Sequence, residues 1–239
     1  MSRDRESPAV SHPQLPLALR LREGMDFEAF LPPAGAEVAV ARVRSLARGE
    51  EPGGQVWLRG APGSGRTHLL EAAVREAGGG ASLLPGEELA QLPADVFEGL
   101  EGLSLLALDD VEALAGHRTH EEALFHLYNR CRDSGTALLF AAAAAPGDCG
   151  FALPDLASRL AAGPVFRLPE LEDAELAGLF RLRARRRGLI VGEREAAWLV
   201  RRCERRAAAV VDLLEWLDRE ALARGRRLTT PFVKELTGW

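Results

Sequence analysis

Apolar residues follow two different spacings along the chain, and their order predicts an α/β protein. Between residues 36 and 168, short continuous apolar runs alternate with stretches in which apolar residues recur every three or four positions. The runs are typical of strands buried on both faces, and the stretches are typical of amphipathic helices. Strands separated by helices form a parallel sheet that is covered on both faces. The expected strands are Gln55–Leu58, Ala81–Leu84, Ser104–Leu108, Leu138–Ala142 and Val165–Leu168, and the expected helices are Ala36–Ala47, Thr67–Ala77 and Glu121–Arg132.

Beyond Pro169 the strand pattern gives way to a helical pattern that continues to the last residues. Thr230 followed by Pro231 is typical of a helix cap and a first-turn proline, so a short final helix is expected there. Three longer helices are expected at Asp173–Arg187, Glu193–Arg202 and Ala207–Arg224. The predicted parts are a flexible tail over residues 1-24, an α/β base over 25-168 and a small all-helical lid over 169-239.

The segment between the first expected strand and the next helix reads Gly-Ala-Pro-Gly-Ser-Gly-Arg-Thr. It matches the phosphate-binding pattern G-x-x-x-x-G-K-[ST] at every fixed position except one, where Arg66 replaces the lysine. Glycines let backbone N–H groups turn toward a phosphate, and the helix that follows adds its positive end. Because a guanidinium is bulkier than an ammonium group, we expect phosphate binding to persist and self-hydrolysis to suffer. The predicted nucleotide-binding residues of this loop are Gly60, Gly63, Ser64, Gly65, Arg66 and Thr67.

Two aspartates follow the apolar run that predicts the third strand. In a protein with a phosphate loop, an aspartate at this place supports a magnesium ion, and Asp109 together with the Thr67 hydroxyl is the predicted Mg²⁺ pair. Asp110 stands where many ATPases place a glutamate that orients the attacking water, although its side chain is shorter. Alone, such a run usually marks a strand that enters a polar turn, but paired with the loop it predicts a nucleotide site.

Composition excludes several classes of protein. The 239 residues carry a formal net charge of -5, which argues against DNA binding driven by overall charge. Three widely spaced cysteines form neither a metal-binding pattern nor a disulfide framework, as is typical of a reducing cytoplasm. The polar start resembles no signal peptide, and no apolar run approaches the length of a membrane span. We therefore expect a cytoplasmic protein with no structural metal and no membrane contact.

The tail contains one small apolar segment, Gln-Leu-Pro-Leu-Ala-Leu at residues 14–19. Pro16 favours an extended backbone, on which Leu15, Leu17 and Leu19 project to the same side. Such a segment is suited to a pocket on a partner protein. The spacing fits equally well an edge segment that packs on its own domain, and the residues alone leave both interpretations open.

Several stretches together resemble Hda, a family of DnaA-related regulatory inactivators of bacterial replication initiation. The resemblance implies an AAA+ P-loop base with a parallel five-stranded sheet between helices, followed by a small helical lid. It also implies a clamp-binding role for Gln14, Leu15, Leu17 and Leu19, a nucleotide-binding role for Phe30, and an arginine finger at Arg159. Beside the loop, the stretches that carry it are residues 14–19, Phe27-Glu28-Ala29-Phe30, Leu127-Tyr128-Asn129-Arg130, residues 153–160 and residues 228–235.

This family binds the DNA-loaded sliding clamp of DNA polymerase III and promotes hydrolysis of the ATP held by DnaA. The resemblance therefore implies DnaA and the clamp as partners, DNA contact mainly through the clamp, a location at the nucleoid and a possible homo-oligomer. It implies ADP, with or without Mg²⁺, as the cofactor. Ala143 and Ala208 stand where relatives carry polar or charged residues that contact phosphates, so the protein's own ATPase is expected to be weak or absent. The alternative is an autonomous AAA+ ATPase that loads a helicase or a clamp.

Overall fold

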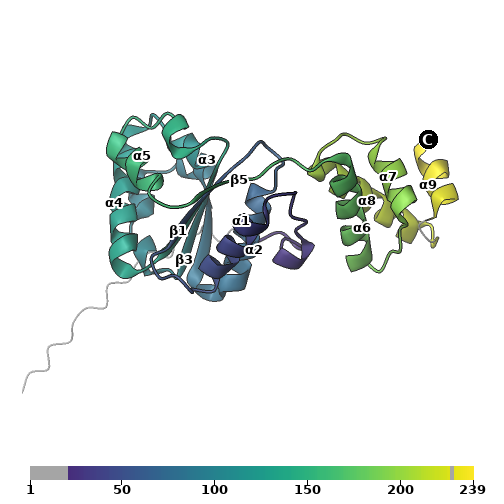
Figure 1. The fold of residues 1–239 in the computed structure, drawn as a ribbon, viewed down its shortest axis with the longest axis horizontal. Coiled ribbons are helices and arrows are strands. Elements are labelled where there is room, and N and C mark those ends of the chain that lie inside the picture. Colours follow the sequence, from purple (N-terminus) through teal and green to yellow (C-terminus); the bar gives the residue numbers. More distant parts are fainter. Residues whose placement is uncertain (1–20, 227–228) are drawn as a thin grey trace, which may run out of the picture.

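The computed structural model describes residues 21–226 and 229–239. Its centre is one sheet of five parallel strands in the order β2-β3-β4-β1-β5 (Figure 1). The predicted parallel sheet is confirmed, and each predicted strand lies within two residues of its observed bounds. The strands are β1 (Gln55–Arg59), β2 (Ala81–Pro85), β3 (Leu105–Asp109), β4 (Ala137–Ala142) and β5 (Val165–Arg167).

Helices cover both faces of the sheet, as continuous apolar strands require. The helix α1 (Glu37–Ala47) precedes β1, and between the strands lie α2 (Arg66–Ala77), α3 (Gly86–Leu89), α4 (Arg118–Ser134) and α5 (Pro154–Leu160). The apolar spacing did not predict the short 3₁₀ helices, since three or four residues are too few to show a period. These are η1 (Phe27–Ala29), η2 (Gly78–Gly80), η3 (Ala94–Phe97), η4 (Leu100–Gly102), η5 (Val111–Leu114) and η6 (Pro146–Asp148).

The pleat of the strands divides the core of the base into two layers. Val56 and Leu58 pack with α1 and α2 on one face, while Trp57 packs with α4 and α5 on the other. The same alternation runs through β3 and β4, because successive strand side chains point to opposite faces. Both layers are therefore fixed by the same strands, and the carboxyl ends of β1, β4 and β3 are held side by side at one edge.

The C-terminal helices form a lid with a core of its own. The lid consists of α6 (Asp173–Arg186), α7 (Glu193–Val200), α8 (Ala207–Ala223) and α9 (Thr230–Thr237), and it lies to one side of the base (Figure 1). Its helices bury a shared apolar cluster that includes Phe180 and Leu214. The predicted cap of the last helix was one residue off, because the Thr229 hydroxyl accepts the Phe232 N–H at 3.4 Å. Within residues 21–226 and 229–239, no helix is both long and apolar enough to cross a membrane.

Candidate nucleotide-binding site

The glycine-rich loop leaves the carboxyl end of β1 and leads directly into α2. Gly63 and Gly65 have φ angles of 85° and 94°, a region that favours glycine. A Cβ atom on Gly60 would lie 2.5 Å from Ser64 Oγ and 2.7 Å from the backbone oxygen of Leu168. The loop conformation therefore depends on glycine at these three positions, and the predicted loop residues lie together at the edge of the sheet.

Arg66 begins α2, and its side chain is only 9% exposed. Its Nη2 atom lies 3.0 Å from Asp110 Oδ1, and its Nη1 atom lies 3.8 Å from Glu112 Oε1. Within the described part of the chain, both Arg66 Nη1 and Ser64 Oγ are buried without a hydrogen-bond partner. Buried polar atoms without partners are rare. Both of these donors belong to the loop segment, and both are suited to bind the oxygen atoms of a phosphate.

Thr67 and Asp109 lie in direct contact beside this loop. The Thr67 hydroxyl donates a hydrogen bond of 2.5 Å to Asp109 Oδ2, and the Asp110 N–H donates to Asp109 Oδ1. Burial raises the pKa of Asp109, and the hydrogen bond from Thr67 opposes this shift. The structure thus brings together a hydroxyl and a carboxylate, the two ligand types that hold Mg²⁺ beside a nucleotide.

Glu112, on η5, is a member of this site that the sequence did not reveal. Its Oε1 atom accepts a hydrogen bond of 2.7 Å from the backbone N–H of Ala143, just after β4. The contact joins the ends of β3 and β4, which no local pattern encodes. The available signal was an acidic residue two positions after Asp110, and such residues are common in polar turns.

Phe30 lies against the loop. If Gly65 carried a Cβ atom, that atom would lie 2.7 Å from Phe30 Cε2. The Phe30 ring also meets the ring of His68 edge to face, with centroids 5.1 Å apart. Phe30 therefore packs against both the loop and the first turn of α2.

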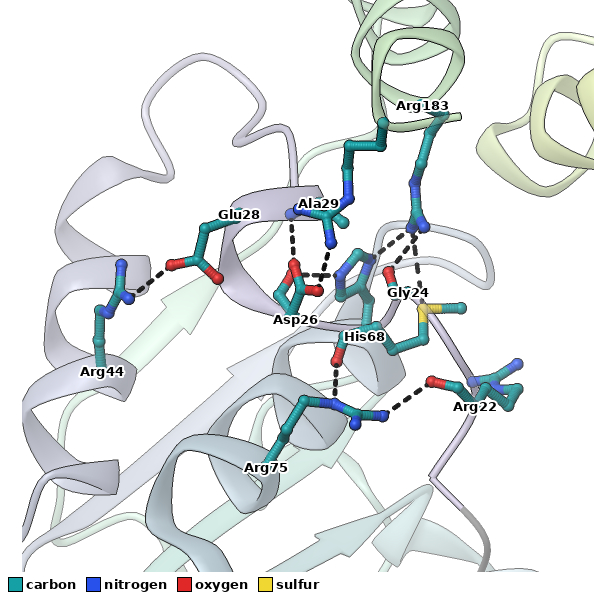
Figure 2. A network of polar contacts seen from close by, with 11 residues as sticks. Arg22, Gly24, Asp26, Glu28, Ala29, Arg44, His68, Arg75 and Arg183 are labelled. Carbon is teal, nitrogen blue, oxygen red and sulfur yellow. Dashed lines mark hydrogen bonds and ion pairs between the residues drawn. The ribbon is translucent and has the colours of Figure 1, made fainter. Parts of the chain in front are cut away.

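The segment that carries Phe30 also joins α2 to the lid helix α6 (Figure 2). Arg183 donates to the carbonyl oxygen of Gly24 at 2.7 Å and lies 3.3 Å from His68 Nδ1, while Arg186 pairs with Asp26 at 2.6 Å. His68 Nε2 lies 2.9 Å from the carbonyl oxygen of Asp26. Because the guanidinium can only donate, His68 accepts at Nδ1 and donates from Nε2, which requires a neutral imidazole. Two arginines of the lid thus bind residues 24–26.

The neutral state of His68 predicts a pH dependence of stability. Burial lowers its pKa from 6.5 to about 4. Between these values the unfolded chain binds more protons, so the free energy of unfolding should fall as the pH drops from 6.5 to about 4, by about 3 kcal/mol in total. Above pH 6.5 this group should have no effect. Urea unfolding across this range should show the fall in the natural chain and a smaller fall in His68→Gln, and equal slopes would contradict the assignment.

Arg159 lies far from this loop. Its exposed side chain extends from α5, with Cζ 5.7 Å from the centroid of the Phe125 ring on α4. Its carbonyl oxygen accepts from Gln55 at the start of β1, while the loop leaves the end of that strand, roughly 13 Å further along. Figure 1 shows α4 and α5 at the end of the base away from the lid. Arg159 therefore does not belong to the loop of its own chain. The predicted clamp-binding residues Gln14, Leu15, Leu17 and Leu19 lie outside the described residues.

Comparison with known proteins agrees with this arrangement. Residues 173–237 match the family model described as the lid domain of Hda. Domain III of the replication initiation protein DnaA from Thermotoga maritima is similar in structure, with a TM-score of 0.77, 18% sequence identity, and coverage of 92% of this chain and 98% of that chain.

Two further solved structures share the fold. AMPPCP-bound DnaA from Aquifex aeolicus has a TM-score of 0.68 at 20% identity, over 81% of this chain and 64% of that chain. The RuvB Holliday junction branch migration motor from Thermotoga maritima has a TM-score of 0.68 at 19% identity, over 90% and 71%. The predicted base, with a parallel five-stranded sheet between helices, and the helical lid that follows it are confirmed. Residues 173–237 are thus similar to the lid domain of Hda, and the chain shares the fold of domain III of DnaA.

Proposed function

We propose that this protein is a regulatory inactivator of DnaA. It binds the DNA-loaded sliding clamp through residues 14–19 and stimulates hydrolysis of the ATP held by DnaA, which restrains replication initiation. The protein acts in the cytoplasm and reaches the nucleoid through the clamp. Residues 25-168 form the base and residues 169-239 form the lid. The observation that carries the proposal is the match of residues 173–237 to the Hda lid.

The position of Arg159 supports action on a partner molecule. The side chain is exposed and lies at the opposite end of β1 from the chain's own loop. An arginine brought to a γ-phosphate from a second molecule stabilises the charge that develops in the transition state, which accelerates hydrolysis by about 10³–10⁵-fold in known switch proteins. Arg159 is the residue of this chain that completes the active site of DnaA.

The loop of the chain itself binds ADP, with Thr67 and Asp109 beside the Mg²⁺ ion. Backbone N–H groups and the start of α2 hold the phosphates, with Ser64 and Arg66 as further donors. When bound, the nucleotide and its metal ion would supply a charged centre that orders the loop. Arg66 and Asp110 form an ion pair at 3.0 Å. Arg66 is the cation of the loop and Asp110 is the candidate residue for orienting the attacking water. Because each is bound to the other, the pair supports weak self-hydrolysis.

A second candidate function is an autonomous AAA+ ATPase that loads a helicase or a clamp. The hydrogen bond between Thr67 and Asp109 favours it, because this pair would hold Mg²⁺ in an active ATPase as well. The replacement of lysine by Arg66 in the loop opposes it.

An assay of phosphate release separates the two functions. DnaA loaded with radiolabelled ATP should hydrolyse it rapidly only when this protein and a DNA-loaded clamp are both present. The protein alone should release phosphate at a rate near that of the buffer. Fast hydrolysis by the protein alone, unchanged by DnaA or the clamp, would favour the ATPase and contradict the proposal.

Clamp binding should depend on the leucines of the tail. We expect the double variant Leu15→Ala and Leu17→Ala to lose at least tenfold in affinity for the clamp, since each buried leucine contributes about 2 kcal/mol at an apolar pocket. Surface plasmon resonance with immobilised clamp measures this loss, and Val10→Ala, in the same tail, is the matched control. Retention equal to that of the natural chain would remove residues 14–19 from the interface.

A further inference from the structure

Two carboxylates surround the single cation of the loop. Asp110 lies 3.0 Å from Arg66 Nη2, and Glu112 lies 3.8 Å from Arg66 Nη1. The three side chains together carry one positive and two negative charges. A phosphate that binds the Arg66 guanidinium must therefore compete with carboxylates that already bind it.

The two carboxylates differ in how firmly they are held. Glu112 Oε1 accepts the backbone N–H of Ala143 at 2.7 Å, and among the described residues its Oε2 atom is buried without a partner. Asp110 is 43% exposed at its side chain, so solvent screens its charge more than that of Glu112, which is 28% exposed. Burying an unpaired carboxylate oxygen costs free energy. The position of Glu112 is therefore set by the residues packed around it and not by the hydration of its carboxylate. Both carboxylates therefore place negative charge beside Arg66, and the charge of Glu112 is the one less exposed to solvent.

This arrangement affects the phosphates of a nucleotide unequally. In a loop of this type, backbone N–H groups cradle the first phosphates, while the residue at the lysine position reaches the last two. The backbone of the loop takes its shape from the positive φ angles of Gly63 and Gly65, so its N–H groups do not depend on the Arg66 side chain. The third phosphate of a triphosphate depends on Arg66 and adds negative charge beside two carboxylates.

We propose that Glu112, with Asp110, makes the loop select a nucleoside diphosphate over a triphosphate. Glu112 is a specificity-determining residue. It lowers the affinity of the loop for a nucleotide with a third phosphate, because its negative charge repels that phosphate and because it interacts with the Arg66 guanidinium that the phosphate needs. The proposal rests on the nucleotide binding assigned to the loop above. It does not depend on the clamp, on DnaA or on Arg159.

Calorimetric titration of the full chain with ADP and with the non-hydrolysable triphosphate AMPPCP, both with Mg²⁺, tests this. Glu112→Gln keeps an oxygen that can accept the Ala143 N–H and removes the charge. We expect it to strengthen AMPPCP binding by about tenfold, or about 1.4 kcal/mol, and to change ADP binding less than about twofold. Glu122→Gln removes the same charge from an exposed position of α4 and should leave both affinities unchanged.

Asp110→Asn provides a second variant, for which we expect a smaller gain, about threefold, for AMPPCP alone. Equal gains for both nucleotides in either variant, or no gain for AMPPCP, would overturn the proposal. Failure of the natural chain and both variants to bind either nucleotide would overturn it too. Stimulation of ATP hydrolysis on DnaA is measured in a separate assay. Failure of the proposed function can therefore be distinguished from failure of this proposal.

Discussion

Replacing Arg159 by alanine should reduce the stimulation of ATP hydrolysis on DnaA by about 10³-fold or more, close to the rate of DnaA alone. The side chain is exposed on α5 and lies over the Phe125 ring, so its loss leaves the core of the base unchanged. Binding to the clamp and binding of ADP should therefore stay within about twofold of the natural chain. Single-turnover phosphate release from DnaA loaded with ATP, in the presence of DNA-loaded clamp, measures the effect.

Two further variants make this experiment specific. Arg48→Ala removes the same charge from the C-cap of α1, on the other face of the sheet, and should leave stimulation intact. Arg159→Lys keeps the charge but loses the planar pair of donors, so it should recover only a small part of the activity. Stimulation by Arg159→Ala at the natural rate would mean that another residue contacts the ATP of DnaA, while the regulatory role itself would still stand.

Much of the fold could be predicted because it depends on local patterns. The strands β3 and β4 are continuous apolar runs whose members all lie buried, so the pattern fixed their burial on both faces. The loop could be predicted because its chemistry is set by glycines at fixed spacing, and Gly63 and Gly65 adopt the backbone angles that the motif requires. The start of the last helix was predicted one residue late, because the cap is Thr229 and not Thr230.

The remaining parts of the site depend on contacts between residues far apart in the sequence. Glu112 meets the N–H of Ala143 31 positions later, and Arg183 meets His68 115 positions earlier. Neither pair produces a recognisable pattern in the sequence, because the arrangement of the strands and the position of the lid bring the residues together. The role of Arg159 is different again, because it came from the resemblance and no pattern around it distinguishes it from an ordinary exposed arginine.

A buried carboxylate holds the segment that presents Arg159. Glu121, on α4, is fully buried. Its Oε1 atom accepts the N–H groups of Gly116 at 2.7 Å and Ala152 at 3.0 Å, and its Oε2 atom accepts that of Leu153, the cap residue of α5, at 2.7 Å. One side chain therefore joins the loop before α4 to the start of α5. Hydrogen bonds to a charged group contribute about 1.5–3 kcal/mol each, so this is a strong junction.

Glu121→Ala should accordingly lower the free energy of unfolding of the base by at least about 3 kcal/mol, because three N–H groups lose their acceptor and a cavity remains. The base alone can be followed by the fluorescence of buried Trp57 during urea unfolding, in a background where Trp198, Trp216 and Trp239 are phenylalanine. Glu122→Ala, the exposed neighbour, should cost less than about 0.5 kcal/mol. Since the start of α5 loses its anchor, Glu121→Ala should also reduce stimulation of DnaA while leaving ADP binding at the far edge of the sheet intact. A variant that lost stability but stimulated DnaA normally would show that Arg159 does not need this junction to reach its target.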